Sequence, residues 1–527
     1  MKKAVRLLSL VLALVMCALT LAACGGNGDT TTPAGTTNSG TTAPTANKWE
    51  NVDLSGSTIR IAYNEYLANT WTASGATNSL PYLTGPDDEG LLSRADYLAA
   101  YERHNRVCEE LGLVPGENLV YSNLGWGGQI DQIITDIQAF NTADSDTAPN
   151  IILHTNYGMV RAGILGELYN CKDDSQQNYF DFTNDNWYTD MMLENTLDED
   201  KFYMLMGDYF IDQFRFAYGI LVNTQIAEDV LTMQGGLDYI YDLVKTGAWD
   251  YDTMMEISGF AYSGTQGDNL VMGAIGDQGW VVRTFFASSG LDVFKRDENG
   301  TPRYIEGADI DPVHDWLDKI ITMSLEEHFS NNWIKDTRNT AKEQVATTFI
   351  NGGALFAINQ PILTLEGNLV QNMDNPAGIL PVPKYDAENT ELGYKALVSD
   401  NANAGGILIS SAPETFTAAS AFIQMMTEES DEFFTQYFVN GLQYKNNDIG
   451  TGHIEMLNII HDSICSPMSF LYDNYCGKAA GYSTYSAIMY PCIDGASNTV
   501  SSQWTSELGA KQSLWSQIIE NFGTRTN

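Results

Sequence analysis

The sequence has little positive charge. It carries 27 lysines and arginines against 67 aspartates and glutamates, which gives a formal net charge of −40 at pH 7. A nucleic-acid-binding surface needs a basic footprint, and so does adhesion to an anionic lipid surface, so the composition argues against both. The acidic excess has two explanations, a well-solvated exterior surface or an acidic functional patch, and we favour the first.

Cysteine and histidine are also scarce. Beyond Cys24 the cysteines are Cys108, Cys171, Cys465, Cys476 and Cys492, an odd number that leaves at least one thiol unpaired. No Cys-x-x-Cys occurs, and the spacing fits no zinc site, so we expect neither a metal nor a cofactor. Two alternatives stay open for Cys465 and Cys476, a disulfide bridge or two buried free thiols.

Common catalytic motifs are missing as well. The sequence contains no Gly-x-Ser-x-Gly and no His-Glu-x-x-His, and its six histidines are scattered. A glycoside hydrolase needs two carboxylates that flank the scissile bond, but 67 acidic residues make any nominated pair uninformative. Residues 297–300 lack the alternating ligands of a calcium loop and predict a hairpin turn. We expect no catalytic residue.

One long apolar run is present, at residues 7–23. It follows Lys2, Lys3 and Arg6 and ends in small residues, which is typical of a secretory signal; it lies at the short end of what a membrane-spanning helix needs. The ending Leu-Ala-Ala-Cys resembles a bacterial lipobox. That resemblance implies cleavage before Cys24, lipid on the new N-terminal cysteine, and a place on the outer face of the cell membrane. The alternatives are a plain membrane helix and a secreted protein.

Residues 24–52 predict a tether. Up to residue 47 the segment consists almost entirely of Gly, Thr, Ser, Ala, Asn and Pro, which bury too little apolar surface to offset the entropy of ordering.

The first part of the body alternates strand and helix. Apolar runs and helical spacing predict a strand, helix, strand, helix and strand at residues 57–63, 91–111, 118–122, 129–140 and 150–154. This alternation requires parallel pairing with right-handed crossovers and therefore an open α/β sheet.

A second block has a similar pattern. The segment 237–260 predicts two helices around a break at residues 247–249, where Trp249 is expected to be a buried structural residue. Further helices are predicted at 313–323, 342–350 and 416–426 and beyond 457, and strands at 216–222, 354–358, 378–381 and 405–410.

Four stretches carry a family resemblance. They are the lipobox with its tether, the helix–Trp turn–helix of 241–252, the helix end, glycine turn and strand of 349–358, and the Gly-x-x-Pro-x-Pro-Lys exit of 378–386. Their order resembles the bacterial ABC-importer extracellular solute-binding lipoproteins of family 1, of the sugar-binding type and the Gram-positive subgroup. Residues 456–463 are similar to a C-terminal helix of that subgroup.

The resemblance implies a two-lobed, periplasmic-binding-protein-like (type II) α/β fold. Each lobe would be an open, mostly parallel sheet flanked by helices, with a ligand cleft between the lobes. Crossings are implied near 212–216, 353–359 and 399–406. The N-terminal lobe would then be 53–212 plus 355–400, and the C-terminal lobe 213–354 plus 401–527.

The resemblance also implies a function. A monomer would capture a mono- or oligosaccharide and deliver it unchanged to the transmembrane subunits of an ABC permease. The alternatives are a surface-anchored glycoside hydrolase, a binding protein for a non-sugar solute such as a peptide, and an adhesive lipoprotein.

Ligand-binding residues are expected just beyond the strands, because open α/β sheets bind ligands outside the carboxyl ends of their strands. Amides and carboxylates suit sugar hydroxyls, and Trp or Tyr rings suit the apolar face of a pyranose. For each candidate, ordinary packing or capping is the alternative. The candidates are Asn64, Glu65, Trp71, Trp126, Asn156, Tyr157, Asp208, Tyr209, Trp280, Asn359 and Gln360.

Overall fold

The structure is a computed structural model that describes residues 48–65, 78–125, 130–143, 147–264, 270–329, 345, 348–371, 373–374, 376–442, 450–473 and 483–523. The chain divides into residues 1–50 and a body of residues 51–527. Cys24 and most of the expected tether lie outside the described residues. Within the described part, no helix combines the length and the apolar character that crossing a bilayer requires.

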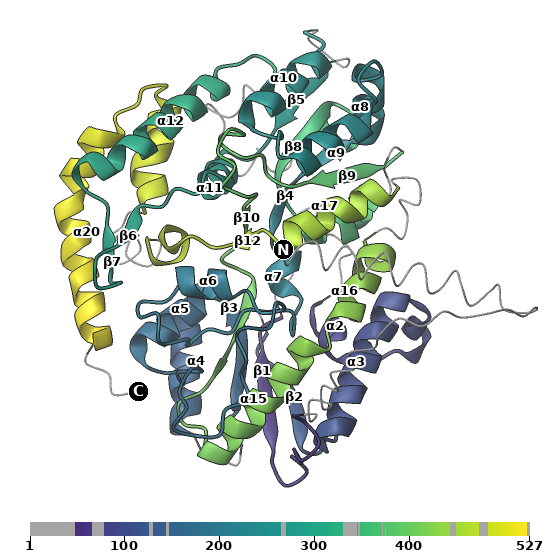
Figure 1. Cartoon of the computed structure of the whole chain (residues 1–527), viewed down its shortest axis with the longest axis vertical. Helices are drawn as coiled ribbons and strands as arrows, with labels where there is room; N and C mark the ends of the chain where they lie inside the picture. The colour runs from purple at the N-terminus through teal and green to yellow at the C-terminus, as the bar shows by residue number, and fades with distance from the viewer. Residues whose placement is uncertain are drawn as a thin grey trace, which may run out of the picture. The chain divides into compact units, whose positions relative to one another are not determined.

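The first sheet follows the expected strand–helix alternation. Its strands are β1 (Ile59–Tyr63), β2 (Leu119–Asn123), β3 (Ile151–Thr155) and β11 (Asn403–Ile407), in the order β11-β3-β1-β2. β1 is parallel to both β2 and β3, and β11 is antiparallel to β3. Helices flank the sheet: α3 (Ala95–Leu111) packs on α15 (Pro413–Glu428), and α4 (Ile130–Thr142) packs on α5 (Asn156–Leu165) (Figure 1).

Local sequence explains where these elements begin and end. β3 is buried along its whole length, as an apolar central strand of an α/β sheet should be. Thr155 caps α5 by accepting a hydrogen bond from the Gly158 amide, and α3 ends at Gly112, whose φ of 69° suits glycine.

The second sheet is mixed. Its strands are β5 (Met272–Ile275), β8 (Ala354–Pro361), β4 (Tyr218–Asn223) and β9 (Ala377–Leu380), in the order β5-β8-β4-β9. β5 and β8 are parallel, whereas β4 is antiparallel to both β8 and β9. Around it lie α8 (Thr224–Val230), α9 (Leu237–Thr246), α10 (Tyr251–Ala261), α11 (Gln278–Ser288) and α12 (Asp311–Ser324) (Figure 1).

Strand pairing corrects the expected lobe boundaries. Of the residues 355–400 expected in the N-terminal lobe, strands β8 and β9 pair with β4 in the second sheet. Conversely, β11 lies in the first sheet, so residues 403–407 do not belong to the C-terminal lobe. The implied crossing at 353–359 is absent, since the turn at Gly352, with a φ of 74°, leads directly into β8.

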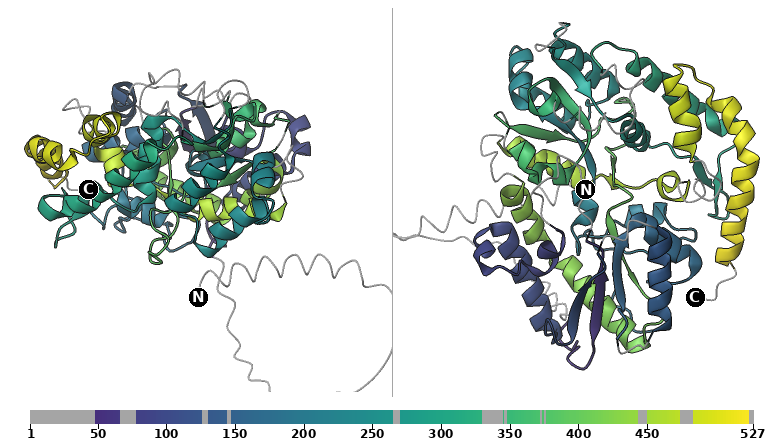
Figure 2. Two further views of the ribbon diagram at one scale, coloured as in Figure 1. Left: turned by 90° about the horizontal axis from the view of Figure 1, so that it is seen from above. Right: turned by 180° about the vertical axis from the view of Figure 1, so that it is seen from behind.

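Two crossing segments run side by side between the sheets. The first, through α7 (Asp212–Arg215), leads into β4, and the second, residues 398–403, leads back to β11. They are joined where Ala217 bridges Val398 and where the Ser399 amide donates to the Phe216 carbonyl at 3.0 Å. The long helix α20 (Val500–Gly523) also connects the lobes, because it contacts α5 of the first and α12 of the second (Figures 1 and 2).

Short elements complete the described part. They are α2 (Leu80–Thr84), η2 (Glu89–Ser93), α6 (Thr189–Glu194), β6 (Phe294–Arg296), β7 (Pro302–Tyr304), η3 (Gly307–Ile310), η5 (Ile362–Glu366), α14 (Asn368–Gln371), β10 (Ala396–Leu397), α16 (Asp431–Gln436), η6 (Tyr437–Gly441), α17 (Thr451–His461), β12 (Ile464–Cys465), η7 (Ser469–Asp473), η8 (Tyr485–Met489) and α19 (Tyr490–Asp494).

Several smaller predictions are confirmed. Residues 297–300 form the turn between the antiparallel strands β6 and β7. Trp249 is fully buried between α9 and α10, and its indole N–H donates to the Pro381 carbonyl at 2.9 Å. Of the cysteines in the described residues, Cys108, Cys171, Cys465 and Cys492 are free and buried; Cys476 lies outside them.

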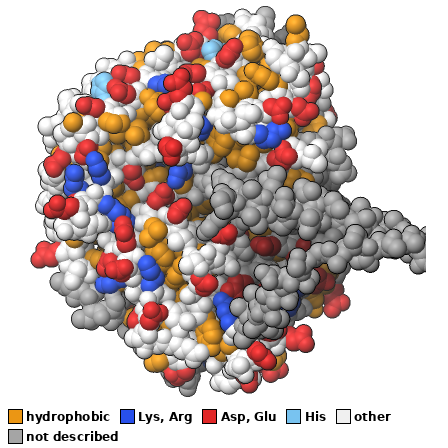
Figure 3. All heavy atoms as spheres, in the orientation of Figure 1, with side chains coloured by type: hydrophobic (Ala, Val, Ile, Leu, Met, Phe, Trp, Pro, Cys, Tyr) orange, Lys and Arg blue, Asp and Glu red, His pale blue; other side chains and the backbone are white. Residues whose placement is uncertain are grey.

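Acidic side chains are distributed over the surface. On the face shown in Figure 3 they are scattered among fewer basic ones rather than gathered in one patch. This distribution fits a solvated exterior better than a single acidic patch.

Candidate functional site

A polar edge forms where β1 and β3 of the first sheet end. Asn64 follows β1, is almost fully buried, and donates from Nδ2 to Oδ1 of Asn403 at 3.2 Å. Asn403 donates back to the Asn64 carbonyl at 3.0 Å. Among the described residues, Oδ1 of Asn64 has no hydrogen-bond partner. Next to it, the Glu65 carboxylate accepts from the side chains of Asn78 and Asn123.

Asn156 lies at the same edge, but its side chain is hydrogen-bonded to the first crossing segment. Its Nδ2 donates to Oε1 of Gln213 at 3.1 Å, and Nε2 of Gln213 donates back to Oδ1 of Asn156 at 2.8 Å. Gln213 also donates to the Asn403 carbonyl at 2.8 Å. The Asn156 side chain is fully buried, so it positions the crossing segments instead of presenting a free amide.

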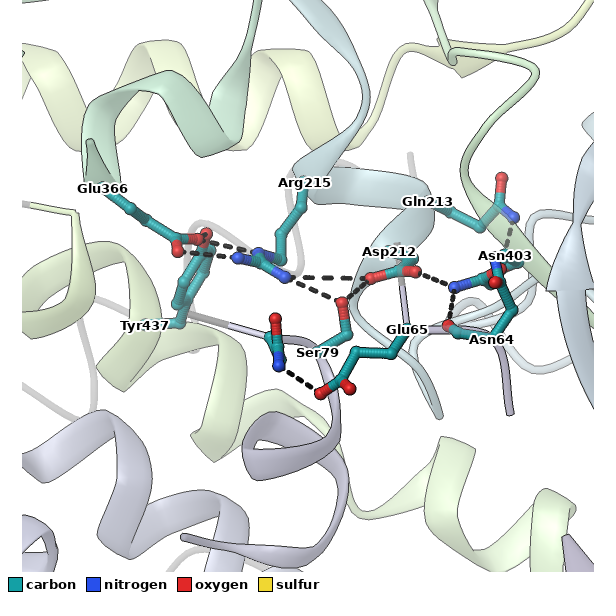
Figure 4. A network of polar contacts seen from close by, with 10 residues as sticks. Asn64, Glu65, Ser79, Asp212, Gln213, Arg215, Glu366, Asn403 and Tyr437 are labelled. Carbon is teal, nitrogen blue, oxygen red and sulfur yellow. Dashed lines mark hydrogen bonds and ion pairs between the residues drawn. The ribbon is translucent and has the colours of Figure 1, made fainter. Parts of the chain in front are cut away.

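A buried ion network continues from this edge along the first crossing. Asn403 donates to Asp212 at 2.6 Å, and Ser79 links Asp212 to Arg215 (Figure 4). Arg215 makes a two-pronged contact to Glu366, with Nε and Nη2 at 2.8 and 2.7 Å from its oxygens. Burial raises the pKa of Asp212, although Arg215 opposes that rise.

The side chains of Asp208 and Tyr209 have hydrogen-bond partners within the protein. The Asp208 carboxylate accepts from Tyr188 and from Nε2 of His461 at 2.9 Å. The Tyr209 hydroxyl donates to the Leu205 carbonyl at 2.8 Å, and the residue is buried. Both side chains therefore have structural partners.

The second sheet contributes an aromatic cluster near the start of α11, made of Tyr218, Trp280, Arg283 and Phe470. The partly exposed Trp280 ring lies 5.2 Å from the Tyr218 ring and 6.1 Å from Phe470, between ring centroids. The Arg283 guanidinium stacks over Trp280 at 4.8 Å, and its Nε has no hydrogen-bond partner among the described residues. Burial by itself would lower the pKa of the Arg283 guanidinium. The electrostatic effects of Tyr490 and Asp400 are larger, so the Arg283 pKa is raised.

Asn359 lies near the end of β8, close to Gly276 in the segment that precedes α11. Its φ of 55° is rare for a residue with a side chain, and its Oδ1 is buried without a partner among the described residues. A Cβ on Gly276 would come within 3.1 Å of that oxygen, so glycine leaves it room. The next residue, Gln360, donates to the Ile358 carbonyl at 3.1 Å.

Residues of both sheets meet near the aromatic cluster. The backbone amide of Tyr157, at the start of α5, donates a hydrogen bond to the Asp400 carbonyl at 3.3 Å. The negative charge of the Asp400 carboxylate raises the pKa of Arg283. Asp400 thus interacts both with Tyr157 at the start of α5 and with Arg283 of α11. Trp71 and Trp126 lie outside the described residues.

Sequence reasoning missed four participants, Tyr218, Arg283, Asp400 and Phe470. Arg283 follows Trp280 by three residues on α11, a spacing that places two side chains on one face of a helix, but the predicted helices do not include this one. Phe470 is 190 positions away in the chain and gave no local signal. Among the described residues, no grouping of histidine, cysteine and carboxylate side chains could hold a metal ion.

No family model and no curated protein sequence matches the chain. Among solved structures, it is similar to a cyclo/maltodextrin-binding protein complexed with maltotetraose, with 11% identity, a TM-score of 0.53, and 88% of this chain and 98% of that one covered. The chain has the two-lobed solute-binding fold. Two further matches are a family 1 extracellular solute-binding protein from Bifidobacterium longum subsp. infantis (12% identity, TM-score 0.47, 88% and 100% covered) and the GacH receptor of Streptomyces glaucescens (10%, 0.45, 89% and 100%).

Proposed function

We propose that this protein is an extracellular solute-binding protein that captures a carbohydrate where its two sheets meet and delivers it to an ABC permease. One observation carries the proposal: among the described residues, a buried amide oxygen without a hydrogen-bond partner lies on Asn64, just after β1 of the first sheet, and another lies on Asn359, near the end of β8 of the second sheet. A buried acceptor without a donor is costly, and sugar hydroxyls supply donors.

The aromatic cluster suits the rest of such a ligand. The partly exposed Trp280 ring offers a flat apolar surface for the C–H face of a pyranose, and Arg283 offers guanidinium N–H groups to its oxygens. The fold matches a protein crystallised with maltotetraose, which supports an oligosaccharide as the first ligand to try.

The proposed mechanism uses the crossing segments as a hinge. A ligand that contacts Asn64 on one lobe and Asn359 on the other favours the closed arrangement, because it makes both sets of contacts only there. A lipid on Cys24 would hold the protein at the outer face of the membrane, where a permease receives the closed form.

A thermal-shift screen of the purified protein against mono- and oligosaccharides tests the proposal. A ligand that binds only the folded state raises the melting temperature, and small-angle scattering should then show compaction with the same sugar. No shift with any sugar, or a shift without compaction, would contradict capture between lobes. Chromatography of the incubated sugar separates binding from hydrolysis, since a binder returns it unchanged.

A further inference from the structure

A second cavity lies at the opposite end of α11 from Trp280, about 10 Å further along the helix. Its volume is about 590 Å³, within the range of small-molecule sites. Its lining comes from separate parts of the chain: Glu194 of α6, the end of α11 with the residues that follow it, strand β6, residues 391–395 and residues 465–468. None of the residues proposed above for sugar binding lines it.

The basic residues that line this cavity already have partners. Lys295 pairs with Asp309 at 3.1 Å, and Lys395 pairs with Glu194 at 3.3 Å. Arg296 donates to the backbone carbonyls of Leu193, in α6, and Thr196, just beyond α6, each at 2.7 Å. Ligand anions would therefore have to displace existing contacts.

Asp292 differs from these basic residues because it has no ion-pair partner among the described residues. Its carboxylate accepts from the backbone amides of Phe294 at 3.1 Å and Ser469 at 3.2 Å, and the Ser469 side chain also acts on it as a hydrogen-bond donor. No lysine, arginine or histidine of the described residues lies within ion-pair distance of it. Burial raises the Asp292 pKa to about 7, with the Glu194 carboxylate adding to the effect. The cavity thus holds a poorly compensated acidic group.

Part of the cavity wall is apolar and is formed by Leu291, Phe294, Leu392, Pro467 and Met468. The end of α11 also lies here, and a helix C-terminus favours positive charge nearby. We propose that this cavity is a second ligand site that takes a small organic cation, with its ammonium group on Asp292 and its apolar body against these walls. The site does not depend on sugar binding at Trp280.

Three probes with one ring and different charge test the proposal: benzylamine, benzyl alcohol and benzoate. In calorimetric titrations of the purified full chain at pH 8, benzylamine should bind, and the other two should bind at least about tenfold more weakly. Asp292→Asn keeps the size of the side chain and removes its charge, so it should weaken benzylamine binding by about tenfold or more. Equal binding of benzyl alcohol, or an unchanged affinity in Asp292→Asn, overturns the proposal.

A second variant keeps the test valid if Asp292→Asn folds poorly. Gly393 lines the cavity, and a Cβ placed there meets no atom within 4 Å, so Gly393→Trp should fill the space without a backbone clash. It should abolish benzylamine binding, whereas Gly56→Trp, at an equally open glycine away from the cavity, should not. Trp280→Ala should leave benzylamine binding unchanged; a loss there would mean that the amine occupies the sugar site instead.

Discussion

Asn403 donates a hydrogen bond of 2.6 Å to Asp212, across 191 positions of the chain. The two residues belong to the two crossing segments, and the same Asn403 side chain also bonds to Asn64 at the edge of the first sheet. One amide therefore connects the crossings to the candidate site. A change of angle between the lobes has to be accommodated around this contact.

Replacing Asn403 by alanine should destabilise the fold by about 2–3 kcal/mol. The change removes one hydrogen bond from the buried Asp212 carboxylate and leaves the Asn64 side-chain N–H without its acceptor, so buried polar groups lose solvation without full compensation. Urea unfolding followed by circular dichroism measures the loss. Asn458→Ala, an exposed position on α17, should change stability by less than about 0.5 kcal/mol. Equal effects of the two variants would contradict a special role for Asn403.

Losing one partner of the Arg215–Glu366 ion pair should destabilise the fold more than losing both. Both side chains are buried, so Arg215→Met should cost about 3–5 kcal/mol by leaving Glu366 charged and unpaired. The double variant Arg215→Met/Glu366→Leu removes both charges and should be more stable than Arg215→Met alone. A double-mutant cycle from urea unfolding gives the coupling, and a double variant less stable than Arg215→Met would refute this account.

The sequence predicted the first sheet well because its signals are local. Apolar runs placed β1, β2 and β3 within a few residues, and the alternation with helices required parallel pairing. The lobe boundaries were wrong because they depend on which strand β8 pairs with. Its partner β4 is more than a hundred residues earlier, and no local pattern records that choice.

The same limit applies to the site. The rule that ligands bind beyond strand ends selected Asn64 and Asn359, whose amide oxygens have no hydrogen-bond partner in the described residues, and both remain predictions. It also selected Asn156, whose amide is occupied by Gln213, and Asp208, which is occupied by His461. Whether a polar side chain is free or satisfied depends on its tertiary partner, which the spacing of residues does not reveal.

Trp280→Ala should lower the affinity for the sugar found by screening by about tenfold, with little loss of stability. The ring is partly exposed, so its removal takes away a stacking surface without opening a large cavity. Calorimetric titration measures the affinity. Phe260→Ala, which removes a 49% exposed ring on α10, serves as the matched control and should bind normally. An unchanged affinity in Trp280→Ala would remove this ring from the site.

Asn359 allows stability and binding to be separated. Because its φ of 55° suits glycine, Asn359→Gly should be at least about 1 kcal/mol more stable than Asn359→Ala, which keeps a Cβ in the left-handed region. Both variants lack the amide oxygen, so both should bind sugar equally weakly. Thermal unfolding and calorimetric titration provide the two readings. Normal sugar binding by either variant would show that the Asn359 side chain does not contact the ligand.

His461 should make stability depend on pH in the alkaline range. Burial alone would keep the imidazole neutral, but the Asp208 carboxylate, 2.9 Å away, and Asp462 reverse that effect and raise the His461 pKa from 6.5 to about 10. The folded state thus holds a proton that the unfolded chain releases at lower pH. This contribution is fully present below pH 6.5 and is lost as the pH rises through about 10.

The variant His461→Gln isolates this contribution. At pH 6 it should be less stable than the parent by about 3 kcal/mol, because Asp208 then lacks its charged partner. Urea unfolding at intervals from pH 6 to pH 10 should show this difference shrinking steadily. For Asn458→Ala, an exposed position on α17 whose side chain carries no titratable group, the difference from the parent should stay nearly constant over the range. A constant difference for His461→Gln as well would mean that the imidazole is not charged in the folded protein.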